Sequence, residues 1–336
     1  MKKYAVVGMG AIGSLIGGYL TKAGLDVTLI SAFRREQAEF LRVNGLTISG
    51  IEGQGEEFHV SVKSTFLGDL ASDTMFDVIF LTLKSNDLLT VVTALRPHLS
   101  SDGFLVTTQN GISEETLIPI VGKKRVIAGS TFAGGVLIAP GHMASHDGHF
   151  YVGELDCSMT ERLNELASVL SNVRPAFTTT EIRSYQWDKL ARVCLSVPVA
   201  CISGLFLGSV FTEIRLMRLF AALALELFAV AEADGYERRT VEERTKEQWL
   251  DIIEGRKTGL EDYKGVPWPD GIIDAYTMDI QKGRPLEIDH TNGAVIRLGK
   301  KYGVPTPVNE RLVECVRAVE KGKATPGFHL VDVVLC

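Results

Sequence analysis

The chain has 336 residues, enough for two domains that each bury a core of their own. Its formal net charge of −6 argues against a broad nucleic-acid-binding surface, which needs an excess of Lys and Arg. The five cysteines are scattered, with no Cys-x-x-Cys pair, so neither a zinc site nor a disulfide framework is supported, and no other metal site is predicted.

The start of the chain has the order strand, glycine turn, helix, strand. Residues 4–7 form a short apolar run that ends in a glycine-rich turn. Residues 15–23 have a helix-forming composition, and Gly24 follows as a typical helix stop. Residues 27–30 then form a second apolar strand. This order predicts a dinucleotide-binding βαβ unit.

The glycine turn itself reads Gly8-x-Gly10-x-x-Gly13. In such a turn the first glycine allows the tight bend, the second lets the backbone approach a pyrophosphate, and the third lets helix and strand pack closely. Ala11 and Ile12 open the helix, where free N–H groups and the helix dipole favour phosphate. The alternative is a glycine-rich turn with a structural role only.

Cofactor choice depends on the residues that follow the second strand. An NAD-dependent enzyme usually has Asp or Glu there to bind the ribose hydroxyls. This chain has no acid at that point, and Ser31, Arg34 and Arg35 can instead bind a 2′-phosphate. We therefore expect NADP(H) as the cofactor. NAD stays open, because arginines at a helix start are often simply solvated.

The remaining N-terminal half alternates between predicted strands and helices. We expect, in order, a helix over 35–43, a hairpin-like excursion over 46–62, a strand over 76–83, a helix over 88–95, a strand over 104–108 and a group of strands over 126–153. Lys84 and Asn110 each follow a buried strand, so both are expected on the nicotinamide side of the sheet. For Asn110 the alternative is a plain Asn-Gly turn.

Helical periodicity dominates after about residue 182. The expected helices are 189–197, 213–233, 240–253, 273–280, 289–302 and 309–319. We therefore expect an α/β nucleotide-binding domain over 1–180 and a helical substrate and dimerisation domain over 181–336. The longest apolar run, 219–233, is too short to span a membrane and contains Glu226. With no signal peptide at the start, a cytoplasmic protein without a membrane partner is expected.

Two polar residues of the helical half are candidates for chemistry. Lys189 shares an apolar helix face with Val193 and Val197, so it either lies at the edge of that face or is buried with a lowered pKa. Glu287 lies in a polar segment before a predicted helix, where an N-cap alone explains only one or two of the polar residues.

Together these motifs resemble those of the ketopantoate reductases (2-dehydropantoate 2-reductases) over nearly the whole chain. The matching motifs are the glycine turn, Leu83-Lys84, Asn110-Gly111, the glycine-rich stretch 141–153, Trp187-Asp188-Lys189-Leu190, and Pro285-Leu286-Glu287-Ile288-Asp289 with Asn292-Gly293. The resemblance implies an α/β Rossmann-type domain followed by an all-α domain like that of 6-phosphogluconate dehydrogenase. It also implies NADPH-dependent reduction of a 2-oxo acid, ketopantoate to pantoate, in pantothenate biosynthesis.

The resemblance further implies roles for individual residues. Lys189 matches the general acid that protonates the developing alkoxide, and Glu287 matches a residue that bonds the substrate hydroxyl or the lysine network. Lys84 and Asn110 match residues that line both the cofactor and the substrate. Helical domains of this kind are also compatible with a homodimer.

The chain departs from the family pattern where the substrate is held. Val193 and Val197 stand in place of two asparagines, a third asparagine falls near Leu207, and the serine that binds the substrate carboxylate falls near Ala275. A hydrogen bond to a charged group contributes roughly 1.5–3 kcal/mol, so losing two costs about two to four decades in affinity or rate.

Three readings of the function follow from this departure. Tyr276, Thr277 or Arg192 can replace the lost contacts, in which case the family activity is expected to remain. The chain can instead be a paralogue for a more apolar carbonyl or hydroxy acid. A non-catalytic NADP-binding sensor is the third reading, which retention of both Lys189 and Glu287 argues against. We take the family activity as the leading expectation.

Overall fold

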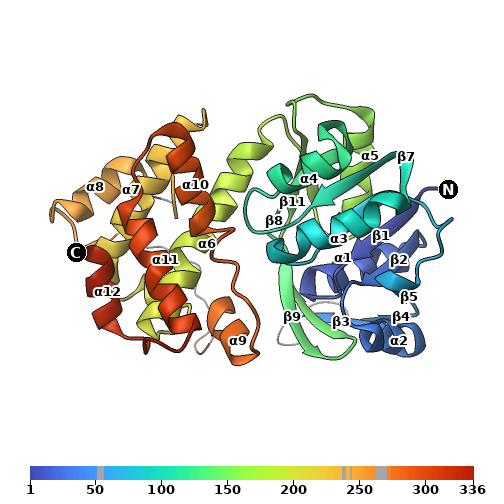
Figure 1. The fold of residues 1–336 in the computed structure, drawn as a ribbon, viewed down its shortest axis with the longest axis horizontal. Helices are drawn as coiled ribbons and strands as arrows, with labels where there is room; N and C mark the ends of the chain where they lie inside the picture. The colour runs from blue at the N-terminus through green and yellow to red at the C-terminus, as the bar shows by residue number, and fades with distance from the viewer. Residues whose placement is uncertain (51–56, 237–239, 243, 262–270, 272) are drawn as a thin grey trace. The chain divides into compact units, whose positions relative to one another are not determined.

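The structure is a computed structural model that describes residues 1–50, 57–236, 240–242, 244–261, 271 and 273–336. The chain divides into two compact units, Met1–Tyr185 and Gln186–Cys336. The first is α/β and the second is helical, which confirms the predicted fold class (Figure 1).

The first unit is built on an eight-stranded sheet, counted over the described residues, with the order β12-β11-β8-β7-β6-β1-β2-β5. These strands are β1 Lys3–Val7, β2 Asp26–Ser31, β5 Lys63–Phe66, β6 Phe76–Leu81, β7 Leu99–Thr107, β8 Val126–Thr131, β11 Phe150–Glu154 and β12 Ala176–Thr178. β1 pairs in parallel with both β2 and β6. The chain leaves β1 toward β2 and β5 and later returns to β6 on the other side. Ligands bind at the carboxyl ends of strands at such a switch point.

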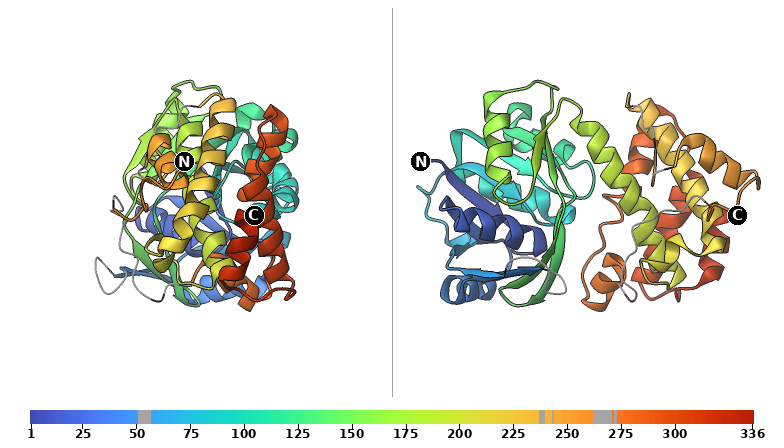
Figure 2. Two further views of the ribbon diagram at one scale, coloured as in Figure 1. Left: turned by 90° about the vertical axis from the view of Figure 1, so that its left-hand side faces the viewer. Right: turned by 180° about the vertical axis from the view of Figure 1, so that it is seen from behind.

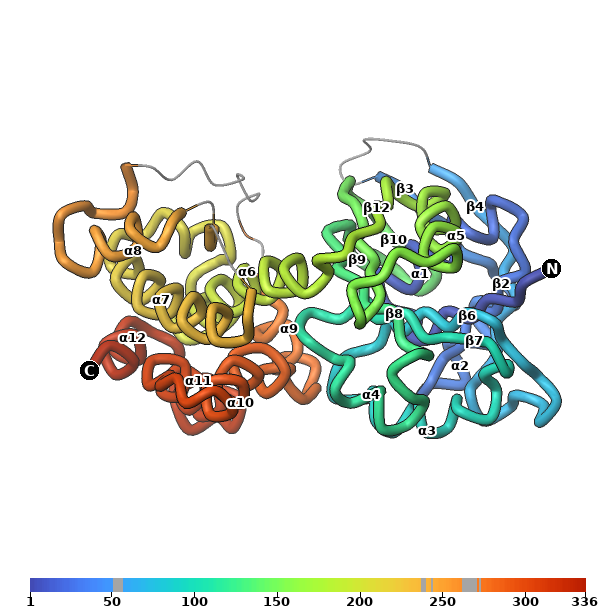
Figure 3. Tube along the Cα trace, turned by 90° about the horizontal axis from the view of Figure 1, so that it is seen from above, coloured from blue at the N-terminus to red at the C-terminus, as the bar shows by residue number. Residues whose placement is uncertain are grey.

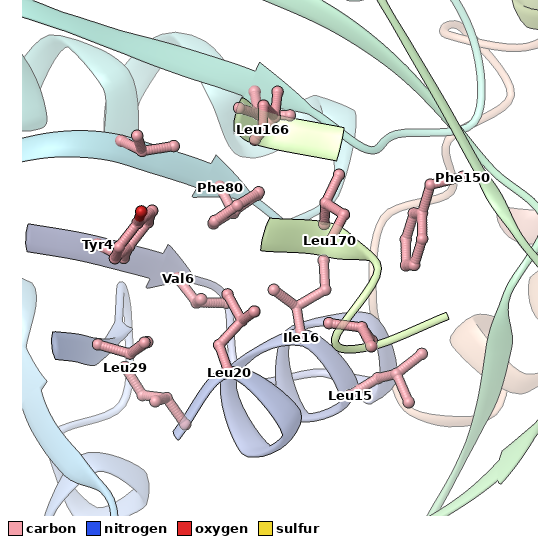
Figure 4. Packing of buried hydrophobic residues seen from close by; sticks show 14 of the residues in the cluster. Tyr4, Val6, Leu15, Ile16, Leu20, Leu29, Phe80, Phe150, Leu166 and Leu170 are labelled. Atoms are coloured by element: carbon pink, nitrogen blue, oxygen red, sulfur yellow. The ribbon is translucent and has the colours of Figure 1, made fainter. Parts of the chain in front are cut away.

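Helices cover both faces of this sheet, as Figure 3 shows. They are α1 Ala11–Lys22, α2 Arg35–Asn44, α3 Leu88–Leu95, α4 Glu114–Val121 and α5 Glu161–Leu170. Alternate residues of a strand point to opposite faces. In β1, Val6 therefore packs with residues of α1 and α5, whereas Ala5 and Val7 pack with residues of α3 and α4. Figure 4 shows Leu15, Ile16 and Leu20 of α1 in the first of these cores.

A second sheet of four strands has the order β4-β3-β10-β9 among the described residues. Its strands are β3 Leu46–Gly50, β4 Phe58–Val60, β9 Gly134–Ala139 and β10 His142–His146. β3 and β4 are antiparallel, which confirms the predicted hairpin within the described residues. Helix α1 lies between the two sheets: a Cβ on Gly17 would meet Leu29 of β2, and one on Gly18 would meet Ile48 of β3.

The second unit consists of helices and their connections over its described residues, as the two views of Figure 2 show. The helices are α6 Ile182–Ser203, which starts in the first unit, α7 Met217–Ala233, α8 Lys246–Ile253, α9 Ala275–Gln281, α10 Asn292–Tyr302, α11 Pro307–Glu320 and α12 Phe328–Leu335. The apolar helix α7 is the central element, because α8, α10, α11 and α12 all pack against it. None of the helices in the described ranges is long and apolar enough to cross a membrane.

Several element boundaries differ from the prediction. The helix expected over 240–253 begins only at Lys246, because Thr245 and Gln248 form a capping box that starts it there. The helix expected over 189–197 is longer at both ends and includes Pro198. Strands β5 and β12 and helices α4, α5 and α12 were not predicted.

Candidate active site

Three neighbouring strands of the main sheet end in candidate residues. Gly8 follows β1 directly, Lys84 follows the end of β6, and Asn110 follows the end of β7. The order β7-β6-β1 makes these strands adjacent and parallel, so the three positions lie at one edge of the sheet. The side chains of Lys84 and Asn110 are half-buried.

Hydrogen bonds tie the loops at this edge to one another. The hydroxyl of Thr82 donates to the carbonyl oxygen of Gly8 across 2.8 Å. The side-chain amide of Gln109 donates to the carbonyl oxygens of Leu81 and Leu83, at 2.6 and 3.0 Å. The loops after β1, β6 and β7 are therefore held together before any ligand binds. Sequence reasoning did not single out Thr82 or Gln109, whose partners lie far away along the chain.

The glycine turn has the geometry that a pyrophosphate requires. Gly8 has φ +106°, a conformation that favours glycine. A Cβ on Gly13 would lie 1.8 Å from the carbonyl oxygen of Gly8, whereas a Cβ on Gly10 would meet nothing within 4 Å. Among the described residues no side chain caps the N-terminus of α1, so the N–H groups of its first turn, which includes Ala11 and Ile12, are available to an anion at this end of the helix. The turn thus fits a dinucleotide pyrophosphate.

The residues after β2 form a small polar network around Gln37. The buried hydroxyl of Ser31 and the guanidinium of Arg34 both donate to Oε1 of Gln37, each across 3.3 Å. Nε2 of Gln37 in turn donates to the carbonyl oxygen of Met9 across 2.9 Å. Gln37 therefore links the glycine turn to the residues predicted to bind a 2′-phosphate. Its role was not predicted, because nothing in its position along the chain marks it.

The two arginines at the start of α2 have different surroundings. Arg35 pairs with the carboxylate of Asp69, and its guanidinium lies 4.8 Å from the ring centre of Phe66. Arg34 is exposed, and no carboxylate within the described ranges forms an ion pair with it. Arg34 is therefore the arginine that is free to bind an added phosphate.

In the second unit, Lys189 lies on the accessible stripe of α6 together with Val193 and Val197. All three are half-buried, while most of their neighbours on the helix are fully buried. Burial lowers the pKa of the Lys189 ammonium to about 8; the charge of Arg192 adds to this effect, and that of Glu242 opposes it. Lys189 thus combines the two alternatives expected from the sequence, because it lies at the edge of the buried face and has a lowered pKa.

Glu242 is a further charged residue near Lys189 that sequence reasoning missed. Its Oε1 lies 3.1 Å from Nε of Arg192, and its side chain is almost fully buried. Arg192, one of the residues expected to compensate for the missing asparagines, is therefore already paired with Glu242. No spacing rule predicts such a pair, since its two members are far apart in the chain.

The segment around Glu287 forms a tight turn before α10. The N–H of His290 donates to the carbonyl oxygen of Glu287 across 2.8 Å, and the side chain of Glu287 is half-buried. Tyr276 is buried, and its hydroxyl lies 2.6 Å from that of Thr291. Tyr276 is therefore already engaged within the fold.

Ala275 and Leu207 occupy the other positions where the family pattern has polar residues. Ala275 is the exposed first residue of α9, and Leu207 is buried. Neither can donate a side-chain hydrogen bond to a substrate. The candidate residues thus fall into two groups: the glycine turn, Ser31, Arg34, Lys84 and Asn110 in the first unit, and Lys189, Val193, Val197, Ala275 and Glu287 in the second.

Comparison with known proteins identifies the family. The model of ketopantoate reductase PanE/ApbA matches residues 4–156, and the model of its C-terminal part matches 181–320. The chain belongs to the ketopantoate reductase family. Both the glycine turn and the segments with Lys189 and Glu287 lie within the matched ranges, and the protein is an oxidoreductase of this family.

Individual members of the family are distant from this chain. A 2-dehydropantoate 2-reductase of Archaeoglobus fulgidus is 28% identical over 324 residues, which cover 96% of this chain and 99% of the relative. Among solved structures, a PanE/ApbA family ketopantoate reductase from Ralstonia eutropha has a TM-score of 0.77 at 25% identity, covering 96% of this chain and 99% of the other. A D-mandelate dehydrogenase with NADH and anilino(oxo)acetate has the same coverage and a TM-score of 0.80 at 23% identity, which supports the shared fold.

Proposed function

We propose that this protein is an NADPH-dependent reductase of a 2-oxo acid, with Lys189 as the general acid. The observation that carries the proposal is the lowered pKa of Lys189, about 8, on the accessible stripe of α6. A general acid works best when its pKa lies near the working pH, because it is then largely protonated and still gives up its proton readily. An ordinary exposed lysine, with a pKa of about 10.4, is a much weaker acid.

The cofactor is expected to be a nicotinamide dinucleotide. The uncapped first turn of α1 and the open space beside Gly10 support a bound pyrophosphate. Ser31 and Arg34 favour NADPH over NADH, because Arg34 is exposed with no carboxylate to pair with among the described residues. NADPH bound there supplies the hydride.

The protein's own residues then complete the reaction. As the carbonyl carbon of the substrate gains a hydride, its oxygen gains negative charge, and the ammonium of Lys189 stabilises this charge and donates a proton to the oxygen. Glu287 is proposed to hold the resulting hydroxyl or the lysine itself. Lys84 and Asn110, at the ends of β6 and β7, are proposed to contact both cofactor and substrate.

Ketopantoate is the first candidate substrate, because relatives that align over almost the whole chain are named 2-dehydropantoate 2-reductases. A 2-oxo acid with a larger apolar side chain is the second candidate. It is favoured by the accessible stripe of α6, where Lys189 is followed by Val193 and Val197 instead of amides. An apolar side chain placed against two valines gains from leaving water, whereas the hydroxyl of ketopantoate would lose its partners there.

A substrate panel tests the proposal. The oxidation of NADPH, followed by nicotinamide absorbance, is measured with ketopantoate and with 2-oxo acids that carry branched or aromatic side chains. The variant V193N/V197N restores the amides, so it is expected to raise kcat/KM for ketopantoate and to lower it for the apolar acids. If the wild-type protein oxidises NADPH with none of these acids, the proposed function is wrong.

A further inference from the structure

Helix α6 contains a break in its hydrogen bonding that another helix repairs. Pro198 has no N–H, so it cannot donate to the carbonyl oxygen of Cys194 four residues earlier. This oxygen instead accepts a hydrogen bond from Nδ2 of Asn292, at 3.1 Å. Cys194 and Asn292 are both fully buried. A buried carbonyl oxygen without a donor is costly, so Asn292 supplies what proline removes.

The orientation of Asn292 is fixed by a chain of partners behind it. The other hydrogen of its amide is donated to Oδ1 of Asn309 across 2.9 Å. Nδ2 of Asn309 donates to Oε2 of Glu226 across 2.7 Å. Because an ionised carboxylate only accepts hydrogen bonds, Asn309 must turn its NH₂ toward Glu226 and its oxygen toward Asn292. The NH₂ of Asn292, which donates one hydrogen to Asn309, therefore has its second hydrogen directed at the carbonyl oxygen of Cys194.

Glu226 is itself held in place at the start of α11. Its two carboxylate oxygens accept the backbone N–H groups of Val308 and Asn309, at 2.7 and 3.0 Å. Burial raises the pKa of Glu226, and the hydrogen bonds from Asn309 and Val308 oppose that rise. The chain of hydrogen bonds thus runs from α7 through α11 and α10 to α6.

The position of this contact connects it to the proposed chemistry. Cys194 lies little more than one helical turn beyond Lys189 on α6, and Asn292 directly follows the tight turn that begins at Glu287. The N–H of Gly293 donates to the carbonyl oxygen of Ile288 across 2.9 Å, so backbone hydrogen bonds join this turn to the start of α10. A shift of Asn292 relative to α6 would therefore shift Glu287 relative to Lys189.

We propose that Asn292 is a positioning residue, whose hydrogen bond to the break in α6 sets the placement of Lys189 against Glu287. The inference rests on the proposed function, in which these two residues meet the substrate. A displacement of about 1 Å at a reacting group can reduce the rate about a hundredfold. The alternative is that Asn292 only satisfies a buried carbonyl oxygen and contributes stability alone.

Two variants separate these alternatives. Asn292→Ala removes the tie between α10 and α6 and leaves both the Cys194 oxygen and Oδ1 of Asn309 without this donor. Adding Pro198→Ala gives α6 back its own N–H donor for the Cys194 oxygen, so the double variant should recover part of the lost thermal stability while still lacking the tie. If Asn292 positions Lys189, both variants have kcat reduced ten- to a hundredfold, with the Kd for NADPH within twofold of wild type. If the double variant regains wild-type kcat together with its stability, the inference is overturned.

A second readout does not depend on turnover. The pKa of Lys189 is measured from the pH dependence of its acylation by an amine-reactive reagent, quantified by mass spectrometry. Both Asn292 variants are expected to shift this pKa, because a changed placement of Lys189 changes its burial and its distance from neighbouring charges, and an unchanged pKa would contradict the inference. Val331→Ala is the matched control, because it removes buried apolar atoms from α12 in the same unit without changing α6. It should lower Tm and leave the pKa of Lys189 unchanged.

The two proposals fail in different ways. If Lys189→Met leaves turnover unchanged, the proposed function is wrong whatever the Asn292 variants do. The acylation experiment on the Asn292 variants still shows whether Asn292 sets the environment of Lys189. If Lys189→Met abolishes turnover while the Asn292 variants keep both kcat and the lysine pKa, only the positioning inference fails.

Discussion

Nε2 of Gln37 donates to the carbonyl oxygen of Met9 across 2.9 Å, so the first turn of α2 holds the middle of the glycine turn. Oε1 of the same side chain accepts hydrogen bonds from Ser31 and Arg34. One amide therefore connects the part of the site that suits a pyrophosphate with the part that suits a 2′-phosphate. One end of this amide donates hydrogen bonds and the other accepts them. Replacement by glutamate, which has the same shape, therefore removes the donor and keeps the acceptor.

Replacing Gln37 with Glu should weaken NADPH binding at least tenfold and NADH binding less. The carboxylate cannot donate to Met9, and its charge repels a 2′-phosphate held by Arg34. Fluorescence titration with both nucleotides measures the two affinities. Glu36→Gln, at an exposed neighbouring position of α2, serves as the control and should change neither affinity by much. Equal losses of affinity for NADPH and NADH would show that Gln37 does not contribute to the choice between the two cofactors.

Arg34→Ala and Arg35→Ala form a matched pair. Arg34 is exposed and faces Gln37, whereas Arg35 is paired with Asp69 beside Phe66. Arg34→Ala should therefore narrow the preference for NADPH over NADH, and Arg35→Ala should leave it close to wild type. The ratio of the two Kd values, measured by titration, is the quantity to compare. A wild-type protein that binds NADPH and NADH equally well would contradict the proposed preference.

Two glycine variants should separate folding from cofactor binding. Gly13→Ala places a Cβ against the carbonyl oxygen of Gly8 and should lower Tm strongly. Gly10→Ala has open space around its Cβ and should leave Tm nearly unchanged, yet its methyl group occupies the approach to the pyrophosphate. Thermal unfolding without nucleotide and NADPH titration measure the two effects. Unimpaired binding by Gly10→Ala would place the phosphates elsewhere.

The pH dependence of reduction follows from Lys189. With a pKa of about 8, Lys189 is protonated below that pH, so kcat should be high near pH 7 and fall as the pH rises through about 8. Lys189→Ala should reduce kcat by about 10²–10⁴, the usual contribution of a general acid, while NADPH still binds. The measurements are kcat from pH 6 to about 10 and the NADPH Kd of the variant. A flat profile would exclude Lys189 as the proton donor.

The same pKa predicts how stability changes with pH. Unfolded, Lys189 has a pKa of about 10.4, so between about pH 8 and that value the unfolded chain binds a proton that the folded chain does not. The contribution of Lys189 to stability should therefore rise with pH across this window. Lys189→Met, which retains the apolar stem, should be stabilised relative to wild type most clearly at pH 7. Chemical unfolding at several pH values checks the difference, and a constant difference would show that the folded pKa is normal.

The parts of the candidate site that the sequence can predict are those that a local pattern specifies. The glycine turn is marked by spacing within one turn, and Lys84 and Asn110 are marked by the strands that precede them. The hydrogen bonds of Gln37, Glu242 and Asn292 were not predicted, because each of these residues has a partner distant in the chain.

The elements of the fold were likewise predicted best where the local sequence specifies them. The strands around the switch point are continuous apolar runs, so they were predicted at nearly the right residues. Helix α4 contains Pro119, which weakens its helical pattern, and α12 is a short apolar run that resembles a strand. These elements form because of the surfaces on which they pack. No signal of their own identifies them.

Helix α6 also determines where the chain can be divided into two stable fragments. Its first turn belongs to the α/β unit, where Tyr185 stacks on Tyr151 with ring centres 3.7 Å apart and accepts a hydrogen bond from Ser130. Its next turn belongs to the helical unit, where Trp187 is fully buried and donates to Asp234. Both halves therefore need the same few residues. Stable separate fragments would each have to carry their own copy of the 182–187 segment, and a clean cut after residue 180 would strip it from the nucleotide-binding half.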